Sequence, residues 1–194
     1  ITTSGGGMVA SRDGGVVARA RKRAQQAREP VVWYEHKELG YNHRMSNIVA
    51  AIGVGQLTCL EKIIQKKRQI FEWYRQRLAA RVGFMPEAAY GRCTRWLTVV
   101  ELGEGDVLTC ESSKVLKLVA ALEAEDIEAR PVWKPMHVQP VFRGAKVYGG
   151  RCSERLFERG LCLPSGAGLT EADVGRVCRI CAYALPCDKA VKQR

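Results

Sequence analysis

The segment YEHKELGYNHRMSN at residues 34–47 is the stretch around which the chain is organised. It gathers aromatic, basic and amide side chains and shows no apolar period. A long apolar pattern with helical spacing begins directly after it, and Ser46 stands where a helix N-cap is expected. Dense polar residues beside a rigid helix are typical of a binding loop, although a solvated loop with an N-cap has the same composition.

The stretch before this segment predicts two short strands and a surface helix. Residues 1–11 read ITTSGGGMVAS, a glycine turn between two short runs, which favours paired strands. A phosphate-binding glycine loop is the competing interpretation, but its usual spacing is absent. Residues 16–28 contain no proline and many good helix formers, and Pro30 ends the predicted helix.

The stretch after it predicts one long helix over residues 47–81, because apolar residues recur there every three or four positions. Gly53 and Gly55 weaken this helix locally or permit close packing against another element. Gly83 is placed to end it. Such a helix is long enough to run along a seam between domains or subunits.

The remainder of the chain predicts a small α/β unit. Residues 86–92 form a linker, and residues 133–142 are irregular because two prolines interrupt them. Thr170 and Asp173 have the spacing of a capping box at the start of the last helix. The predicted strands are residues 96–102, 127–132 and 161–164, and the predicted helices are residues 114–125, 153–159 and 170–184.

Length and composition bound the function classes. The chain has 194 residues, 46% of them hydrophobic, which fits one domain or the remainder of a larger one with a real core. No apolar run approaches the roughly 20 residues that span a bilayer, and no secretory signal is visible, so we expect a cytoplasmic protein without a membrane partner.

Cysteine and histidine usage argues against a metal site. The eight cysteines are scattered, and a zinc ribbon would need a second pair beside the single CxxC at Cys178 and Cys181. On a helix those two thiols share one face, which favours buried packing, and we expect reduced thiols throughout. Cys162 lies in a predicted strand and is expected in the core rather than as a nucleophile. The three histidines are not accompanied by clusters of carboxylates or cysteines, which argues against a metal site.

The net charge of +11 comes mainly from two basic clusters on predicted helices. A solvated helical face explains each, and a field that steers an anionic ligand is a further interpretation. A basic nucleic-acid-binding protein is the sharper alternative, but aromatic residues do not interleave with these charges. The clusters are Arg19, Arg21, Lys22, Arg23 and Arg28, and Lys62, Lys66, Lys67 and Arg68.

Four ordered segments resemble the DegT-type sugar aminotransferases, which are pyridoxal-phosphate (PLP) enzymes that aminate keto-sugar nucleotides. They are ITTSGGGMVAS, then YEHKELGYNHRMSN with IVAAIGVGQL, then RPVWKPMHVQPVF, then SERLFERGLCLPSGAGLTEADV, and they span nearly the whole chain. The resemblance implies an α/β fold, the C-terminal portion of a PLP fold-type I aminotransferase. Residues 1–45 would end the large cofactor domain, residues 46–85 would form the connecting helix, and residues 86–194 would form the small domain.

The same resemblance implies roles for individual residues. Asn42 would bind the cofactor phosphate in the neighbouring subunit of a homodimer, and His137 would lie near the substrate. Each candidate keeps a structural alternative: a turn amide, a loop histidine, a surface ion pair or a packed ring. The remaining candidates are Arg44, Arg130 and Lys134 for the diphosphate of a nucleotide sugar, and Tyr34 and Tyr41 for the sugar pocket.

The family's lysine that holds PLP as a Schiff base would lie just before Ile1, and the acidic partner of the cofactor ring further upstream. We therefore expect a C-terminal part that is inactive alone and exposes apolar surface that normally faces the large domain. The amino donor would be glutamate. A regulatory module that binds sugar nucleotides without turnover is the alternative from another class. The sugar and the aminated carbon are left open.

Overall fold

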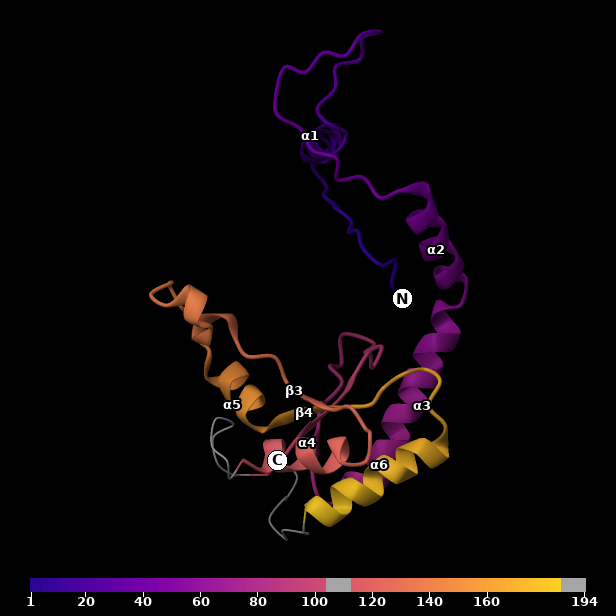
Figure 1. Ribbon diagram of the computed structural model, residues 1–194, viewed down its shortest axis with the longest axis vertical. Coiled ribbons are helices and arrows are strands. Elements are labelled where there is room, and N and C mark those ends of the chain that lie inside the picture. Colours follow the sequence, from indigo (N-terminus) through magenta and orange to yellow (C-terminus); the bar gives the residue numbers. More distant parts are fainter. Residues whose placement is uncertain (104–112, 186–194) are drawn as a thin grey trace. The chain divides into compact units, whose positions relative to one another are not determined.

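The computed structural model describes residues 1–103 and 113–185, and it divides into two compact units, Ile1–Glu61 and Lys62–Arg194 (Figure 1). Each unit is described here by itself. Most of the predicted turn at residues 103–106 lies outside the described residues. So do Cys110, Cys187 and the end of the chain from residue 186.

Helix α1 (Gly14–Ala24) opens the first unit. The Asp13 carboxylate caps it by accepting the backbone N–H of Gly15 at 2.8 Å. The helix ends earlier than the predicted Arg28, because Gln26 and Ala27 adopt positive φ values of 67° and 52°. A chain in that region cannot continue a right-handed helix. This turn leads into Arg28, which forms an isolated antiparallel bridge with His36 in the segment at residues 34–47.

The two strands expected in residues 1–11 are not formed, since no described residue pairs with this segment in a ladder. Its backbone is bonded to a side chain instead: the Thr2 N–H donates to Gln56 Oε1 at 2.8 Å, and Gln56 Nε2 donates back to the Thr2 carbonyl. A strand exists only where a neighbouring strand offers its N–H and C=O groups. The composition alone therefore gave a wrong prediction here.

Helix α2 (Asn47–Thr58) begins at Ser46, whose hydroxyl accepts the Val49 N–H at 3.3 Å, so the predicted N-cap is confirmed. The predicted single helix is wrong, because it is interrupted at Cys59 before α3 (Leu60–Leu78). The Thr58 hydroxyl donates to the Gly55 carbonyl at 2.7 Å and competes with the helical pattern at that point.

The second unit contains a four-stranded antiparallel sheet in the order β1-β2-β4-β3. Strands β2 and β3 flank β4 and run in the same direction, with α4 (Lys114–Glu123) between them in sequence, which is a split βαβ arrangement. Strand β1 was not predicted, since Gly83 was expected only to end a helix. The strands are β1 (Gly83–Phe84), β2 (Thr98–Glu101), β3 (Arg130–Pro131) and β4 (Gly160–Leu163).

Helices complete this α/β unit. Ser113 caps α4 and Thr170 caps α6 (Glu171–Ala184), where the predicted capping box with Asp173 is confirmed. The hydrogen bonds from Thr170 lower the pKa of the Asp173 carboxyl. The remaining helices are the short turns η1 (Met136–Val138) and η2 (Pro140–Phe142) and helix α5 (Arg151–Arg159).

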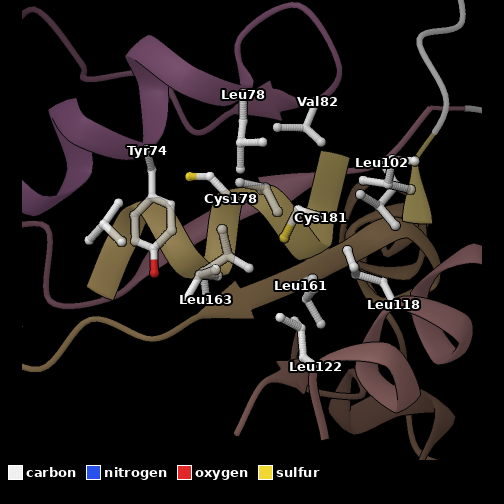
Figure 2. Close-up of a cluster of buried hydrophobic side chains, with 14 of the residues drawn as sticks. Tyr74, Leu78, Val82, Leu102, Leu118, Leu122, Leu161, Leu163, Cys178 and Cys181 are labelled. Carbon is white, nitrogen blue, oxygen red and sulfur yellow. The ribbon is translucent and has the colours of Figure 1, made fainter. Parts of the chain in front are cut away.

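One core joins α3, α4 and α6 to one face of the sheet (Figure 2). Leu122 and Leu161 are fully buried, and the Tyr74 hydroxyl donates to the Pro164 carbonyl at 3.0 Å, so this ring's polar end is satisfied. Cys178 and Cys181 pack in the same core, as predicted, and burial raises their pKa values to about 11 and about 12.

Alternation along β4 places Leu161 and Leu163 in the core and Cys162 on the opposite face. Cys162 is buried, as predicted, and burial raises the pKa of its thiol. Within the described ranges, no single helix is long and apolar enough to cross a membrane, although α2 and α3 meet that criterion as a pair interrupted at Cys59.

Candidate functional site

The signature segment folds back along the end of α1 in the first unit. The Tyr41 N–H donates to the Arg23 carbonyl at 2.7 Å, and the Gln26 N–H donates to the Tyr41 carbonyl at 2.9 Å. Isolated antiparallel bridges join Gln25 to Asn42 and Arg28 to His36. Residues 35–43 are therefore held by backbone bonds rather than left as a free loop.

The glycine of the Gly40-Tyr41-Asn42 turn is required by a close approach between two stretches of backbone. A Cβ atom at Gly40 would lie 2.1 Å from the backbone carbon of Gln26 and 2.2 Å from the Ala27 nitrogen. Only glycine allows the two backbones to approach so closely. This contact fixes the position of the two residues that follow, Tyr41 and Asn42.

Ion pairs tie the segment to α1. Lys22 lies 2.8 Å from Glu29 and 3.5 Å from Glu38, and Arg23 lies 3.2 Å from Glu38. The hydrogen bond from Lys22 lowers the pKa of Glu29, and that from Arg23 lowers the pKa of Glu38. The first basic cluster is thus more than the solvated face that composition favoured, because two of its members position the signature segment.

The predicted site residues of this unit lie on the outer surface of the segment. The Asn42 side chain is exposed and has no hydrogen-bond partner among the described residues, so its amide is free to bind a ligand. Tyr41 stacks on His43 with ring centroids 5.0 Å apart, and the Arg28 guanidinium lies 4.4 Å over the Tyr34 ring. Arg44 is exposed and makes no ion pair within the described part of the chain.

In the second unit, an open groove of about 540 Å³ is lined by β3 with the residues on either side of it, by the end of β4 with the residues after it, and by Leu97 just before β2. We call it the β-end groove. Arg130, Trp133 and Lys134 line one side of it, and Pro164 and Ser165 line another. The structure therefore brings Arg130 and Lys134 together in one hollow. Arg130 is paired at 2.5 Å with Glu128, which also lines the groove.

Lys67 fixes the walls of the β-end groove. Its ammonium donates to the Trp96 carbonyl at 3.0 Å and to the Ser165 carbonyl at 2.8 Å. Desolvation by burial lowers the pKa of Lys67. The second basic cluster therefore also includes a positioning residue, which the expectation of a solvated face missed.

The neighbouring Arg68 orders the stretch that was predicted to be a linker. It forms a two-pronged ion pair with Glu87 at 2.8 and 2.9 Å, and the Glu87 carboxylate also accepts the Cys93 N–H at 2.8 Å. These hydrogen bonds, of which the one from Arg68 has the largest effect, lower the pKa of Glu87 to about 2. Arg95 is buried with its guanidinium 3.8 Å from the Phe71 ring centroid. Residues 86–95 thus form a loop that side-chain contacts hold in place, rather than a free linker.

His137 lies in η1 and is paired with a residue that sequence reasoning missed. Its Nε2 atom is 2.7 Å from Oε1 of Glu154, in the first turn of α5. Gly150 permits this pair, because its φ is 116° and a Cβ there would lie 2.9 Å from His137 Nε2. The sequence signal that could have pointed to Glu154 is its place as an acidic residue in the first turn of a predicted helix.

The pair determines how His137 meets a ligand. A carboxylate can only accept a hydrogen bond, so Nε2–H of His137 is the donor to Glu154, and in this tautomer Nδ1 is left as an acceptor. No group of three or more metal-binding side chains is clustered within the described ranges. What the geometry offers is thus one free amide on the first unit, and two cations and an oriented histidine on the second.

Comparison with known proteins places these features in a family. Residues 1–181 match the DegT/DnrJ/EryC1/StrS aminotransferase family. The putative pyridoxal phosphate-dependent aminotransferase EpsN of Bacillus subtilis is 46% identical over 186 residues, which are 93% of this chain and 46% of EpsN. The GDP-perosamine synthase of Caulobacter vibrioides is 38% identical over 180 residues, 91% of this chain and 47% of that protein. The chain thus spans about half the length of these curated relatives.

The fold has solved counterparts as well. The sugar aminotransferase CalS13 from Micromonospora echinospora superimposes with a TM-score of 0.76 at 21% identity. The match covers 94% of this chain and 48% of CalS13. At this identity the likeness concerns the fold alone.

Proposed function

The chain belongs to the DegT/DnrJ/EryC1/StrS aminotransferase family, and from this premise we propose that it forms the substrate-side portion of a PLP-dependent aminotransferase. The α/β fold is that of the C-terminal part of PLP fold-type I sugar aminotransferases. The reaction we propose moves an amino group from an amino acid, glutamate, to the keto group of a nucleotide-linked sugar. The single observation that carries this proposal is the match of residues 1–181 to the family.

The cofactor contact assigned to this chain is Asn42. PLP, when bound, supplies the electron sink that allows an amino group to leave one carbon and join another. The Asn42 side chain fits a contact to its phosphate, because it is an exposed amide donor on a segment that Gly40 and the Lys22 and Arg23 ion pairs hold in place. We propose that this contact is made to the cofactor of a second subunit, in a homodimer with shared sites.

The substrate contacts are assigned by charge and shape. Lys134 and Arg130 would hold the diphosphate, because both line the β-end groove and both are cations. His137, oriented by Glu154, would accept a hydrogen bond from a sugar hydroxyl at Nδ1. Arg44, Tyr34 and Tyr41 would contact the substrate from the first unit.

The organisation that we propose has three parts along the chain. Residues 1–45 would end the cofactor domain, residues 46–85 would connect it, and residues 86–194 would form the small domain. We propose a cytoplasmic protein, in which the free cysteines of the described residues stay reduced.

The test of the cofactor assignment is the substitution Asn42→Ala in the complete protein, with Asn47→Ala at the start of α2 as a matched control. We expect Asn42→Ala to weaken PLP binding about tenfold, since one hydrogen bond to a charged group contributes roughly 1.5 kcal/mol. PLP absorbance measured during dialysis reports this directly. Equal cofactor retention in both variants would contradict the assignment of Asn42.

A further inference from the structure

Two tryptophans stack beside the β-end groove and keep most of their surface in solvent. Trp96 precedes β2 and Trp133 follows β3, and their ring centroids lie 6.0 Å apart with 26° between the planes. Trp96 is 65% exposed and Trp133 is 63% exposed. Large aromatic rings that stack on each other without being buried indicate a surface that contacts something else.

The position of this pair is fixed by the surrounding structure. The carbonyl of Trp96 accepts a hydrogen bond from Lys67, whose ammonium also holds Ser165 on the groove wall. Trp133 lies two residues after the end of β3 and two residues before Pro135, which restricts the backbone between Trp133 and Pro135. A flat partner would therefore meet rings that are already in place.

The charge beside the rings is positive and partly unengaged. Lys134 follows Trp133 in the groove lining and makes no ion pair among the described residues. Arg130 is the second cation, and its partner Glu128 is the acidic group that lines this part of the groove. An aromatic face next to cations matches a flat heterocycle that carries phosphates.

We propose that Trp96 and Trp133 form a platform on which the nucleobase of a nucleoside diphosphate stacks, with the phosphates directed towards Lys134 and Arg130. The proposal rests on the proposed function and adds to it the subsite for the base. Because every base has a π-face, the platform would recognise the presence of a base more than its identity. A purine offers more stacking area, so GDP would bind more tightly than UDP.

The experiment is a tryptophan-fluorescence titration of the 194-residue chain with GDP, with UDP and inorganic pyrophosphate as comparators. The matched control is Trp33, which is also 63% exposed but lies in the first unit, where its indole N–H donates to Glu35. We expect GDP to quench the fluorescence and Trp133→Leu to weaken GDP binding about tenfold. Trp33→Leu should leave the affinity unchanged, and Trp133→Phe, which keeps a ring, should retain most of it.

Three results would overturn the platform: GDP that leaves the fluorescence unchanged, pyrophosphate that binds as tightly as GDP, or equal GDP affinity in the two leucine variants. The proposed function is judged separately by amino transfer in the complete protein. Trp133→Leu enzyme with an unchanged KM for the nucleotide sugar would refute the platform and leave the function standing. An unaltered enzyme that transfers no amino group would refute the function itself.

Discussion

Gly150 offers the sharpest test of the His137–Glu154 pair, because a neighbouring glycine provides a matched control. Gly149 and Gly150 both have positive φ values, 72° and 116°. A Cβ at Gly149 would meet nothing within 4 Å, whereas one at Gly150 would lie 2.9 Å from His137 Nε2 and 3.1 Å from Glu154 Oε1. Alanine at either position introduces backbone strain, but only Gly150→Ala also separates the pair.

The expected magnitudes follow from these two contributions. Left-handed backbone strain costs about 1–2 kcal/mol for a non-glycine residue, which is the whole effect expected for Gly149→Ala. Gly150→Ala should cost at least about 1–2 kcal/mol more, because the hydrogen bond between His137 and Glu154 is lost as well and the φ of 116° lies further from the left-handed region. Urea unfolding at pH 7 measures both free energies of unfolding.

A second readout separates strain from loss of the pair. In a chain with ¹⁵N-labelled histidine, long-range ¹H–¹⁵N spectra report which ring nitrogen of His137 carries the proton. We expect the Nε2-protonated form in the unaltered chain and in Gly149→Ala, and a mixed population in Gly150→Ala and in Glu154→Gln. Equal stability losses for the two alanine variants, together with an unchanged His137 spectrum, would refute the reasoning.

Four further predictions concern individual side chains. Lys67→Met should lower the free energy of unfolding by about 2 kcal/mol, because it removes two hydrogen bonds from a charged donor to carbonyls; a change below about 0.5 kcal/mol in urea unfolding would contradict this. Thr98→Val should raise the free energy of unfolding by about 1 kcal/mol, because the Thr98 hydroxyl is buried without a partner among the described residues; calorimetry showing a lower Tm would contradict this prediction. Iodoacetamide at pH 8 should label exposed Cys59 but spare Cys178 and Cys181, whose pKa values burial raises to about 11 and about 12. Since those raised values oppose thiolate formation in the native state, the stability that these thiols contribute is complete below pH 9 and falls as the pH rises towards 11. Peptide mass spectrometry and urea midpoints between pH 8 and 10 check both statements.

Local signals predicted the elements whose cause is local. The capping box at Thr170 and Asp173 and the N-cap at Ser46 are both present, because each requires only residues a few positions apart. The buried face of Cys178 and Cys181 followed from helical spacing alone. The small α/β unit was predictable for the same reason, since its strands and helices each carry their own period.

Features that depend on distant partners were not predictable in this way. Residues 1–11 have strand composition but no paired strand among the described residues, and composition cannot reveal that. At the break at Cys59, the Thr58 hydroxyl donates a hydrogen bond to the Gly55 carbonyl, and the sequence does not show which acceptor this hydroxyl has. Lys67 looked like one member of a solvated cluster, and only the fold shows its ammonium bonded to residues 29 and 98 positions away.

The candidate site divides along the same line. Asn42, Arg130, Lys134 and His137 were selected from sequence, because their motifs are short and contiguous. Glu154 and the Trp96–Trp133 stack were not, since each joins residues that only the tertiary structure brings together.

We propose that this chain supplies the substrate side of a PLP-dependent sugar aminotransferase. The most direct measurement is amino transfer from glutamate to GDP- or UDP-linked keto-sugars by the protein encoded by the complete reading frame that contains Ile1. The account predicts PLP-dependent formation of an amino-sugar nucleotide, with Asn42→Ala protein losing cofactor and activity together. A complete protein that holds PLP and aminates no nucleotide-linked sugar, or one that aminates it equally well without Asn42, would contradict the account.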